Sequence, residues 1–154
     1  VQLLRLACGL ARRSSLPALR IFAEENGKMN ARDGADDRAV NPAIAPRHWD
    51  LVVRGMRGAV ERGTAHRQEI GLTRFDCAVK TGTATVGPSD RNENIACLIG
   101  FAPFEEPRVA FVVILERVAG HGGEECGPVA AALLDWLAGE RDLPLRRGAG
   151  KGAR

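Results

Sequence analysis

The chain has 154 residues, of which 45% are hydrophobic, so it can bury one core and is expected to form one domain or part of one. Its formal net charge is +3, but four cations follow Leu143 with no acid among them, and the remaining chain carries −1. This balance argues against a globally basic nucleic-acid binder. The sequence has no run of about 18 apolar residues, so no membrane-spanning helix is predicted.

The N-terminal part is predicted to contain one helix followed by a polar connection. Leucine and alanine recur at helical spacing from Leu3 to Ala11, and Arg12 and Arg13 close the last turn, which predicts a first helix of about three turns. The residues from Glu24 to Asn41 are polar and contain turn signals such as Asn26-Gly27. They predict an exposed connection.

A second helix is predicted to begin at Pro46 and to end at Gly63, which can provide a left-handed stop. Gly55 and Gly58 lie inside it and lower its helix propensity, so close packing of that face against backbone is a plausible reason for them. The apolar stripe of this helix should face a sheet; its members are Trp49, Val52, Val53, Met56 and Val60.

Three strands are predicted over residues 74–86, 95–102 and 108–116, and the short turn-bearing links between them favour an antiparallel meander. The second and third are apolar on both faces, which is typical of central strands covered by helices on each side. The first contains Lys80 and several threonines, so it is expected at an edge that meets solvent or a ligand.

The C-terminal part is predicted to hold one closing helix and a tail. The helix is expected to start at Pro128. The packed domain is therefore predicted over residues 1–143, and the glycine- and arginine-rich residues 144–154 are expected to form a basic, disordered tail. One side of the closing helix should be apolar, with Val129, Leu133, Trp136 and Leu137.

The cysteines and histidines predict no metal site, redox motif or cofactor. They lie far apart, without the pair spacing of a zinc site, and a disulfide between Cys77 and Cys97 is doubtful because Cys97 should lie nearer Thr83. The cysteines are interpreted as small apolar residues and the histidines as surface or loop residues: Cys8, Cys77, Cys97, Cys126, His48, His66 and His121.

The run Lys80-Thr81-Gly82-Thr83 is the strongest functional signal. A lysine on a strand beside a glycine, which lets a substrate backbone approach closely, can bind a peptide carboxylate or tune a neighbouring hydroxyl. An open strand edge can also bind an extended peptide through main-chain hydrogen bonds, and Gly82 would keep that edge open. Four residues alone are a weak signal, and a solvent-facing lysine in a strand is the alternative.

The context of this run is more specific. A helix ending in Gly63-Thr64-Ala65, the lysine strand, the apolar strands and a glycine-rich turn before a helix follow one another in order. From Trp49 to Leu137 this series resembles the C-terminal half of the transpeptidase domain of penicillin-binding proteins, especially the monofunctional class B enzymes. The resemblance implies an α+β fold of the β-lactamase and transpeptidase type, here incomplete, with the three C-terminal strands of a five-stranded antiparallel sheet flanked by helices.

The resemblance also implies a peptidoglycan D,D-transpeptidase, which transfers an acyl group from D-alanyl-D-alanine stem peptides and is trapped by β-lactams. Lys80 would face the serine nucleophile, Thr81 and Thr83 would offer hydroxyls to the substrate carboxylate, and the Thr83 N–H would form half of the oxyanion hole. Strand alternation puts Lys80 and Thr81 on opposite faces, so the sequence leaves open which hydroxyl faces the cleft. The implied location is the outer face of a bacterial cytoplasmic membrane.

The sequence departs from this pattern because it holds no serine nucleophile of the required type. Such a serine lies three residues before a lysine, whereas Ser14, Ser15 and Ser89 are followed at that spacing by Pro17, Ala18 and Asn92. Residues 89–92 are interpreted as a polar hairpin turn. The chain is therefore expected to be a fragment that is inactive alone and needs the upstream half of the domain as a partner. The alternatives are a fragment of a serine β-lactamase or β-lactam sensor, and a non-catalytic remnant that binds cell-wall peptide or partners.

Overall fold

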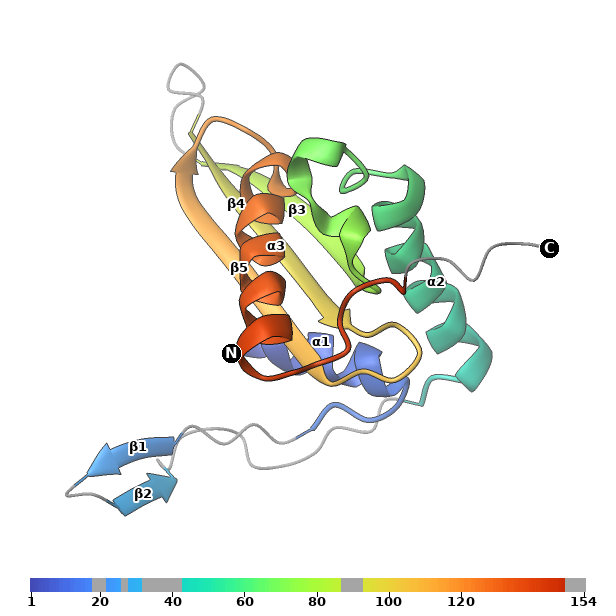
Figure 1. Ribbon diagram of the computed structural model, residues 1–154, viewed down its shortest axis with the longest axis vertical. Helices are drawn as coiled ribbons and strands as arrows, with labels where there is room; N and C mark the ends of the chain where they lie inside the picture. Colours follow the sequence, from blue (N-terminus) through green and yellow to red (C-terminus); the bar gives the residue numbers. More distant parts are fainter. Residues whose placement is uncertain (18–21, 26–27, 32–42, 87–92, 149–154) are drawn as a thin grey trace.

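The computed structural model describes residues 1–17, 22–25, 28–31, 43–86 and 93–148. They form three helices, two short 3₁₀ turns and two antiparallel sheets (Figure 1). The elements, in chain order, are α1 (Gln2–Arg12), β1 (Phe22–Glu25), β2 (Lys28–Ala31), α2 (Pro46–Arg62), η1 (Gln68–Ile70), η2 (Leu72–Arg74), β3 (Ala78–Val86), β4 (Glu93–Ala102), β5 (Val109–Val118) and α3 (Gly122–Glu140).

The main sheet has the order β3-β4-β5, with both pairs antiparallel, so the predicted meander is confirmed. Strand β3 pairs only with β4 and has one open edge within the described residues, as expected of the strand that carries the lysine. It begins at Ala78 rather than at Arg74, because the chain first makes the turn η2. Strand β5 was expected to be central, but it is the other edge strand of the sheet that the described residues form.

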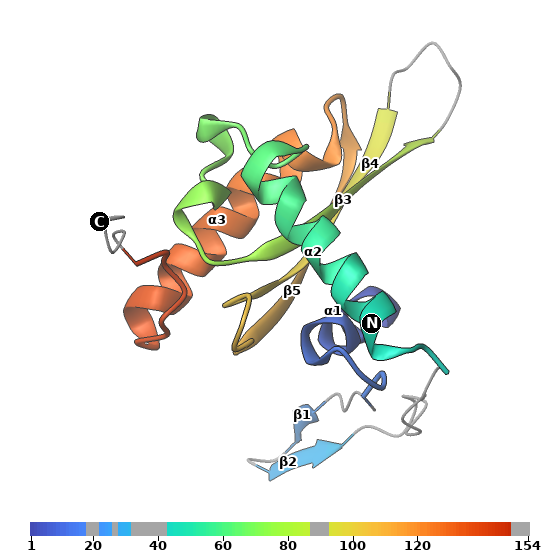
Figure 2. The same ribbon diagram turned by 90° about the vertical axis from the view of Figure 1, so that its right-hand side faces the viewer.

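Helices cover both faces of this sheet, and each face has its own apolar core (Figures 1 and 2). Helix α3 packs over one face, α1 packs over the other, and α2 runs beside β3. Alternate residues of one strand therefore enter different cores: Ala78 faces the α1 side, while Val79 faces the α3 side. Helix α2 contributes to both cores: Val53 lies in the core on the α1 side, and Val60 lies in the core on the α3 side.

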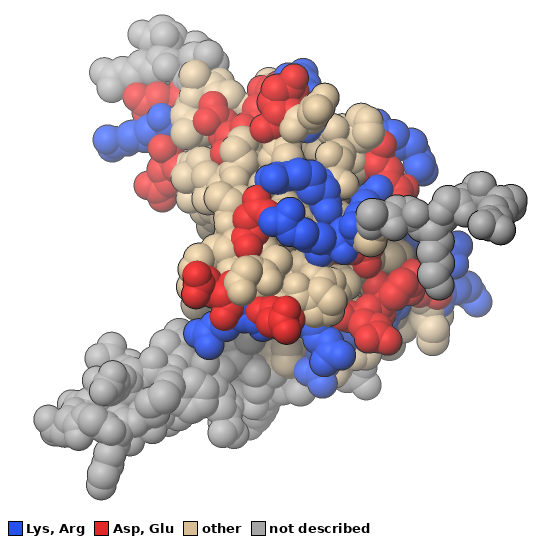
Figure 3. Space-filling view, in the orientation of Figure 1, with Lys and Arg blue, Asp and Glu red and all other residues tan. Residues whose placement is uncertain are grey.

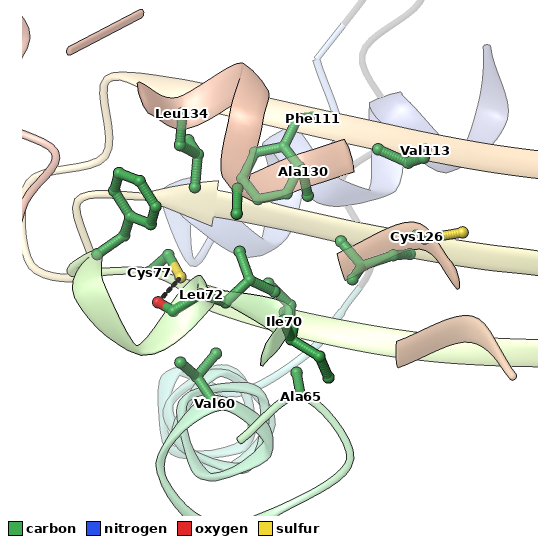
Figure 4. Packing of buried hydrophobic residues seen from close by; sticks show 14 of the residues in the cluster. Val60, Ala65, Ile70, Leu72, Cys77, Phe111, Val113, Cys126, Ala130 and Leu134 are labelled. Atoms are coloured by element: carbon green, nitrogen blue, oxygen red, sulfur yellow. Dashed lines mark hydrogen bonds between the residues drawn. The ribbon is translucent and has the colours of Figure 1, made fainter. Parts of the chain in front are cut away.

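The core under α3 fixes the loop that leads into β3. Figure 4 shows Val60 and Ala65 from the end of α2 and the following loop on one side of Leu72 and Cys77, with Leu134 of α3 on the other. The Cys77 thiol is fully buried and donates to the Leu72 carbonyl at 3.7 Å. This packing holds the residues immediately before β3 and so sets where the strand begins.

Helix α2 matches its predicted bounds, but not the expected roles of its glycines. Gly63 ends the helix at φ −113°, which is not the left-handed conformation; a Cβ there would lie 2.8 Å from the Cα of Ala59. A Cβ on Gly55 would have nothing within 4 Å, and one on Gly58 would meet only the Arg62 side chain, so close backbone packing explains neither glycine. Val52, expected on the buried stripe, is 49% exposed.

Helix α3 differs from its prediction at its start and in its buried face. It begins at Gly122, so Pro128 lies inside the helix rather than at its first turn. Val129 and Trp136, expected to be buried, are 46% and 52% exposed. Leu133 and Leu137 of the expected side are partly buried against the core. The fully buried residues of the helix lie on a neighbouring face and include Cys126, Ala130, Ala131 and Leu134.

Residues 144–148, which fall in the predicted tail, contact the body of the domain. Leu145 is fully buried, and its carbonyl accepts a hydrogen bond from the Asp76 N–H at 2.9 Å. The Arg147 N–H donates to the Arg74 carbonyl at 3.0 Å. On the face that α3 covers, basic and acidic side chains lie next to one another (Figure 3).

The predicted connection over residues 24–41 contains part of a two-stranded hairpin, in which β1 pairs with β2. The rest of that connection, the predicted turn at residues 89–92 and the tail residues 149–154 lie outside the described residues. None of the helices in the described ranges is long and apolar enough to cross a bilayer.

Candidate active site

A groove of about 610 Å³ follows the face of β3 beside its open edge, and we call it the β3 groove. Three segments far apart in the sequence form its walls: the loop after α2, the strand β3 and the first turn of α3, which come together in Figure 1. The lining residues are Gly63, Thr64 and Arg67 from the loop, Thr81, Gly82 and Thr83 from the strand, and Gly122, Gly123 and Glu124 from the helix with His121 immediately before it.

Two glycines allow the start of α3 to approach both other walls. A Cβ on Gly122 would overlap the Gly82 carbonyl oxygen, and a Cβ on Gly123 would overlap the Thr64 carbonyl oxygen. Real Cβ atoms do not come this close to backbone, so only glycine fits at either position. The glycine pair therefore brings the helix terminus into the groove.

One polar contact joins each pair of walls. The Thr64 and Thr81 hydroxyls lie 2.8 Å apart and connect the loop to the strand. The N–H of Gly122 donates to the Thr83 hydroxyl oxygen at 3.0 Å and connects the helix to the strand. An ion pair between Arg67 and Glu124 connects the loop to the helix. The hydroxyls of β3 thus have defined neighbours.

The two faces of β3 separate the residues that the sequence motif groups together. Thr81 and Thr83, two residues apart on the strand, both line the β3 groove. Lys80 is exposed and belongs to the opposite face; it is not among the lining residues, and its ammonium group donates to the Thr81 carbonyl. The structure therefore brings Thr81, Gly82 and Thr83 into one groove and leaves Lys80 beside it.

The first turn of α3 brings both the positive end of the helix dipole and two carboxylates to its end of the groove. The N–H groups at the start of a 19-residue helix carry partial positive charge, and the Gly122 N–H points at Thr83. Glu124 and Glu125 in the first turn balance this charge. The Glu125 carboxylate accepts from the Gly120 N–H at 3.0 Å, which holds the turn that leads into the helix.

The cysteines do not supply a nucleophile to this site. Burial raises the pKa of the Cys77 thiol to about 12. Burial also raises the pKa of the Cys97 thiol, opposite Gly82 on β4, although the charge of Lys80 opposes that effect. The same cause raises the pKa of Cys8 and Cys126, so all four stay protonated thiols at neutral pH. No group of three metal-ligating side chains exists within the described residues.

The family model for the penicillin binding protein transpeptidase domain matches residues 17–135. This chain belongs to that family. A peptidoglycan D,D-transpeptidase, PbpA of Mycolicibacterium smegmatis, is 35% identical over 102 residues, which cover 63% of this chain and 19% of the relative. MrdA of Escherichia coli K12, also a peptidoglycan D,D-transpeptidase, is 31% identical over 104 residues, which cover 58% of this chain and 16% of the relative. The chain therefore spans about a fifth or less of the length of these relatives.

Solved structures of penicillin-binding proteins share the fold. PBP2 of Pseudomonas aeruginosa, solved in complex with WCK 5153, superposes with a TM-score of 0.66 at 26% identity, over 99% of this chain and 32% of that one. A peptidoglycan glycosyltransferase from Burkholderia ambifaria superposes with a TM-score of 0.68 at 20% identity, over 95% of this chain and 42% of that one. The α+β architecture expected from the resemblance is thus confirmed.

Sequence reasoning missed the groove residues outside the β3 motif. Thr64 and the segment 121–124 contribute to the family resemblance only through their order along the chain, and Arg67 carries no signal of its own. The run Gly120-His121-Gly122-Gly123 could have indicated a close backbone approach. What it approaches depends on tertiary packing, which one sequence does not reveal.

Proposed function

We propose that the β3 groove is the substrate-binding wall of a peptidoglycan D,D-transpeptidase active site. In this proposal, Thr81 and Thr83 bind the C-terminal carboxylate of a D-alanyl-D-alanine stem peptide. The observation that carries it is that both hydroxyls of the family's third motif line one groove beside the open edge of β3. The family membership and the D,D-transpeptidase relatives support the reaction class.

The spacing of the two hydroxyl residues suits one carboxylate. Side chains at positions i and i+2 of a strand point the same way and start about 6.6 Å apart, so the two oxygens of one carboxylate can each accept one hydroxyl. The Thr83 oxygen already accepts from the Gly122 N–H, which leaves the hydroxyl proton of Thr83 free to donate.

The remaining groups act beside this anchor. Lys80, exposed on the other face of β3, would place its ammonium group next to a serine hydroxyl that comes from outside residues 1–154. The Thr83 N–H would supply half of the oxyanion hole, a kind of donor whose loss typically costs about 100- to 1000-fold in rate. β-Lactams would react with the same serine, and the domain would work at the outer face of the cytoplasmic membrane.

Titration of the ¹⁵N-labelled chain with N-acetyl-D-alanyl-D-alanine tests the anchor. We expect amide shifts to concentrate on β3 and the first turn of α3, and Thr81→Val to weaken binding about tenfold, as expected for a lost hydrogen bond to a charged group. Thr85→Val is the matched control, because Thr85 lies further along the same strand, outside the groove, and bonds to Asn94. Unchanged affinity in Thr81→Val would refute the proposed anchor.

Fluorescent penicillin tests the position of the nucleophile. We expect no covalent labelling of the isolated chain, because no serine in it precedes a lysine by three residues. Stable labelling of the chain, located by peptide mapping, would show that it holds its own nucleophile.

A further inference from the structure

Arg67 is the one lysine or arginine among the described residues that line the β3 groove. Its guanidinium pairs with the Glu124 carboxylate, which also lines the groove. This pair joins the loop after α2 to the first turn of α3, the two walls that do not belong to the sheet. The cation therefore lies on a different wall from the Thr81 and Thr83 hydroxyls.

The Arg67–Glu124 pair is suited to partner exchange. Its side chains are 68% and 40% exposed, and ion pairs this exposed contribute little stability. Glu124 also has a second source of stabilisation, because it lies in the first turn of α3 beside the positive end of the helix dipole. Release of Arg67 thus leaves Glu124 in a favourable field, and the planar guanidinium is free to bind another carboxylate with two parallel hydrogen bonds.

We infer that Arg67 is a second anion subsite of the groove, which takes a side-chain carboxylate of the bound peptide, and that Glu124 occupies this subsite in the free protein. The inference rests on the proposed function, in which the hydroxyls of β3 take the C-terminal carboxylate of the same peptide. Arg67 then determines specificity, since it favours stem peptides that carry a second anionic group over neutral ones of the same shape.

The test compares two peptides that differ by one charge: acetyl-L-glutamyl-D-alanyl-D-alanine and its L-glutaminyl counterpart. Their affinities for the full chain are measured by NMR titration. We expect the wild-type chain to prefer the glutamyl peptide about threefold, the scale of an exposed ion pair. Arg67→Gln should abolish this preference, so that the two peptides bind the variant equally well. Glu124→Gln should increase the preference, because the internal competitor loses its charge.

Arg62→Gln is the matched control, because Arg62 is an 81% exposed arginine at the end of α2 that does not line the groove. It should keep the wild-type preference. The glutaminyl peptide reports whether each variant still has an intact groove, so a variant that merely fails to fold loses both peptides. Equal wild-type affinities, or a preference that survives Arg67→Gln, would overturn the inference.

Thr81→Val separates this outcome from failure of the proposed function. If both peptides bind equally well and Thr81→Val weakens both, the carboxylate anchor on β3 stands and the Arg67 subsite is wrong. If neither peptide binds, or Thr81→Val changes neither affinity, the proposed function fails and the inference fails with it.

Discussion

At the scale of single residues, Gly123 shows how a missing side chain shapes the groove. Its Cα faces the Thr64 carbonyl so closely that a Cβ would overlap with backbone, which cannot move aside as a flexible side chain can. The glycine therefore costs helix propensity at the start of α3 and allows the contact between two walls of the groove.

Gly123→Ala should lower the free energy of unfolding by about 1–3 kcal/mol, the usual range for forcing an extra methyl group into a packed site. Gly139→Ala, in the last turn of the same helix, is the control, because nothing lies within 4 Å of its added Cβ. It should leave stability unchanged or raise it by up to about 1 kcal/mol. Urea unfolding measures both, and equal effects of the two substitutions would contradict the packing argument.

Glu61 gives the chain a predictable response to acid. A hydrogen bond from Arg57 lowers the pKa of the Glu61 carboxyl from its ordinary 4.5. Because the folded chain holds this proton less tightly than the unfolded chain, the resulting stabilisation is complete above about pH 4.5. It is lost as the pH falls through the lower folded pKa.

Glu61→Gln should therefore reduce stability near neutral pH and flatten its decrease between about pH 5 and 3. The pH dependence of the urea midpoint measures this, with Glu140→Gln, an exposed carboxylate at the end of α3, as the control. If the urea midpoints of the two variants fall equally steeply at acid pH, the Arg57 contact does not stabilise the ionised Glu61 carboxylate.

At the scale of elements, a set of polar contacts made by Asp76 with Arg57 and Phe104, which we call the Asp76 staple, fixes the start of β3. The Asp76 carboxylate pairs with Arg57 of α2 and accepts the Phe104 N–H at 3.2 Å, and the Arg57 guanidinium lies 5.1 Å from the centroid of the Phe104 ring. Both side chains of the ion pair are mostly shielded from solvent. The staple thus connects α2, the residue before the buried Cys77 and the loop after β4.

Asp76→Ala should destabilise the chain by about 2–3 kcal/mol, because it removes one charge-assisted and one backbone hydrogen bond in a half-buried place. Asp76→Asn keeps an oxygen for the Phe104 N–H and should cost about half as much. Thermal and urea unfolding of both variants measure the difference. The staple would have no structural importance if the alanine variant unfolded like the wild type.

Elements that are determined by residues close together in the sequence could be predicted, whereas boundaries that depend on contacts with distant residues could not. Hydrophobic periodicity predicted three helices and the meander because these patterns act between near neighbours, and the mixed polar character of the Lys80 strand placed it at an edge. The predicted start of α3 was wrong because Pro128 is typical of a first helical turn, whereas the actual start is set by contacts of Gly122 and Gly123 with distant backbone.

The candidate site was predictable only where the motif is continuous. The β3 run was found, but the loop residue Arg67 and the helix residue Glu124 reach the groove by folding, and their charges alone are those of any solvated surface. Sequence alone also misplaced part of the buried face of α3, where Ala130 and Ala131 are buried against the sheet and Trp136 is half exposed. Tertiary packing overrides local preference at these places.

At the scale of the whole molecule, the segment after α3 folds back and packs against the core that lies under α3. Leu145 is fully buried, and backbone hydrogen bonds join the segment to Asp76 and Arg74. Side chains add to this contact, because Asp135 of α3 pairs with both Arg74 and Arg146, and both guanidinium groups lie over the Phe75 ring. The segment therefore supports the same turn before β3 that the Asp76 staple holds.

Two truncations test this role of the C-terminal segment. A chain ending at residue 144 should lose about 2–4 kcal/mol of stability, because it gives up a buried leucine and two backbone hydrogen bonds. A chain ending at residue 148 keeps all of these contacts and should unfold at the same urea concentration as the full chain. Leu145→Ala in the full-length chain should reproduce most of this loss, about 2–3 kcal/mol, because it removes the buried side chain and keeps the backbone hydrogen bonds. If truncation at 144 left the unfolding midpoint unchanged, β3 would be positioned by α2 and α3 alone.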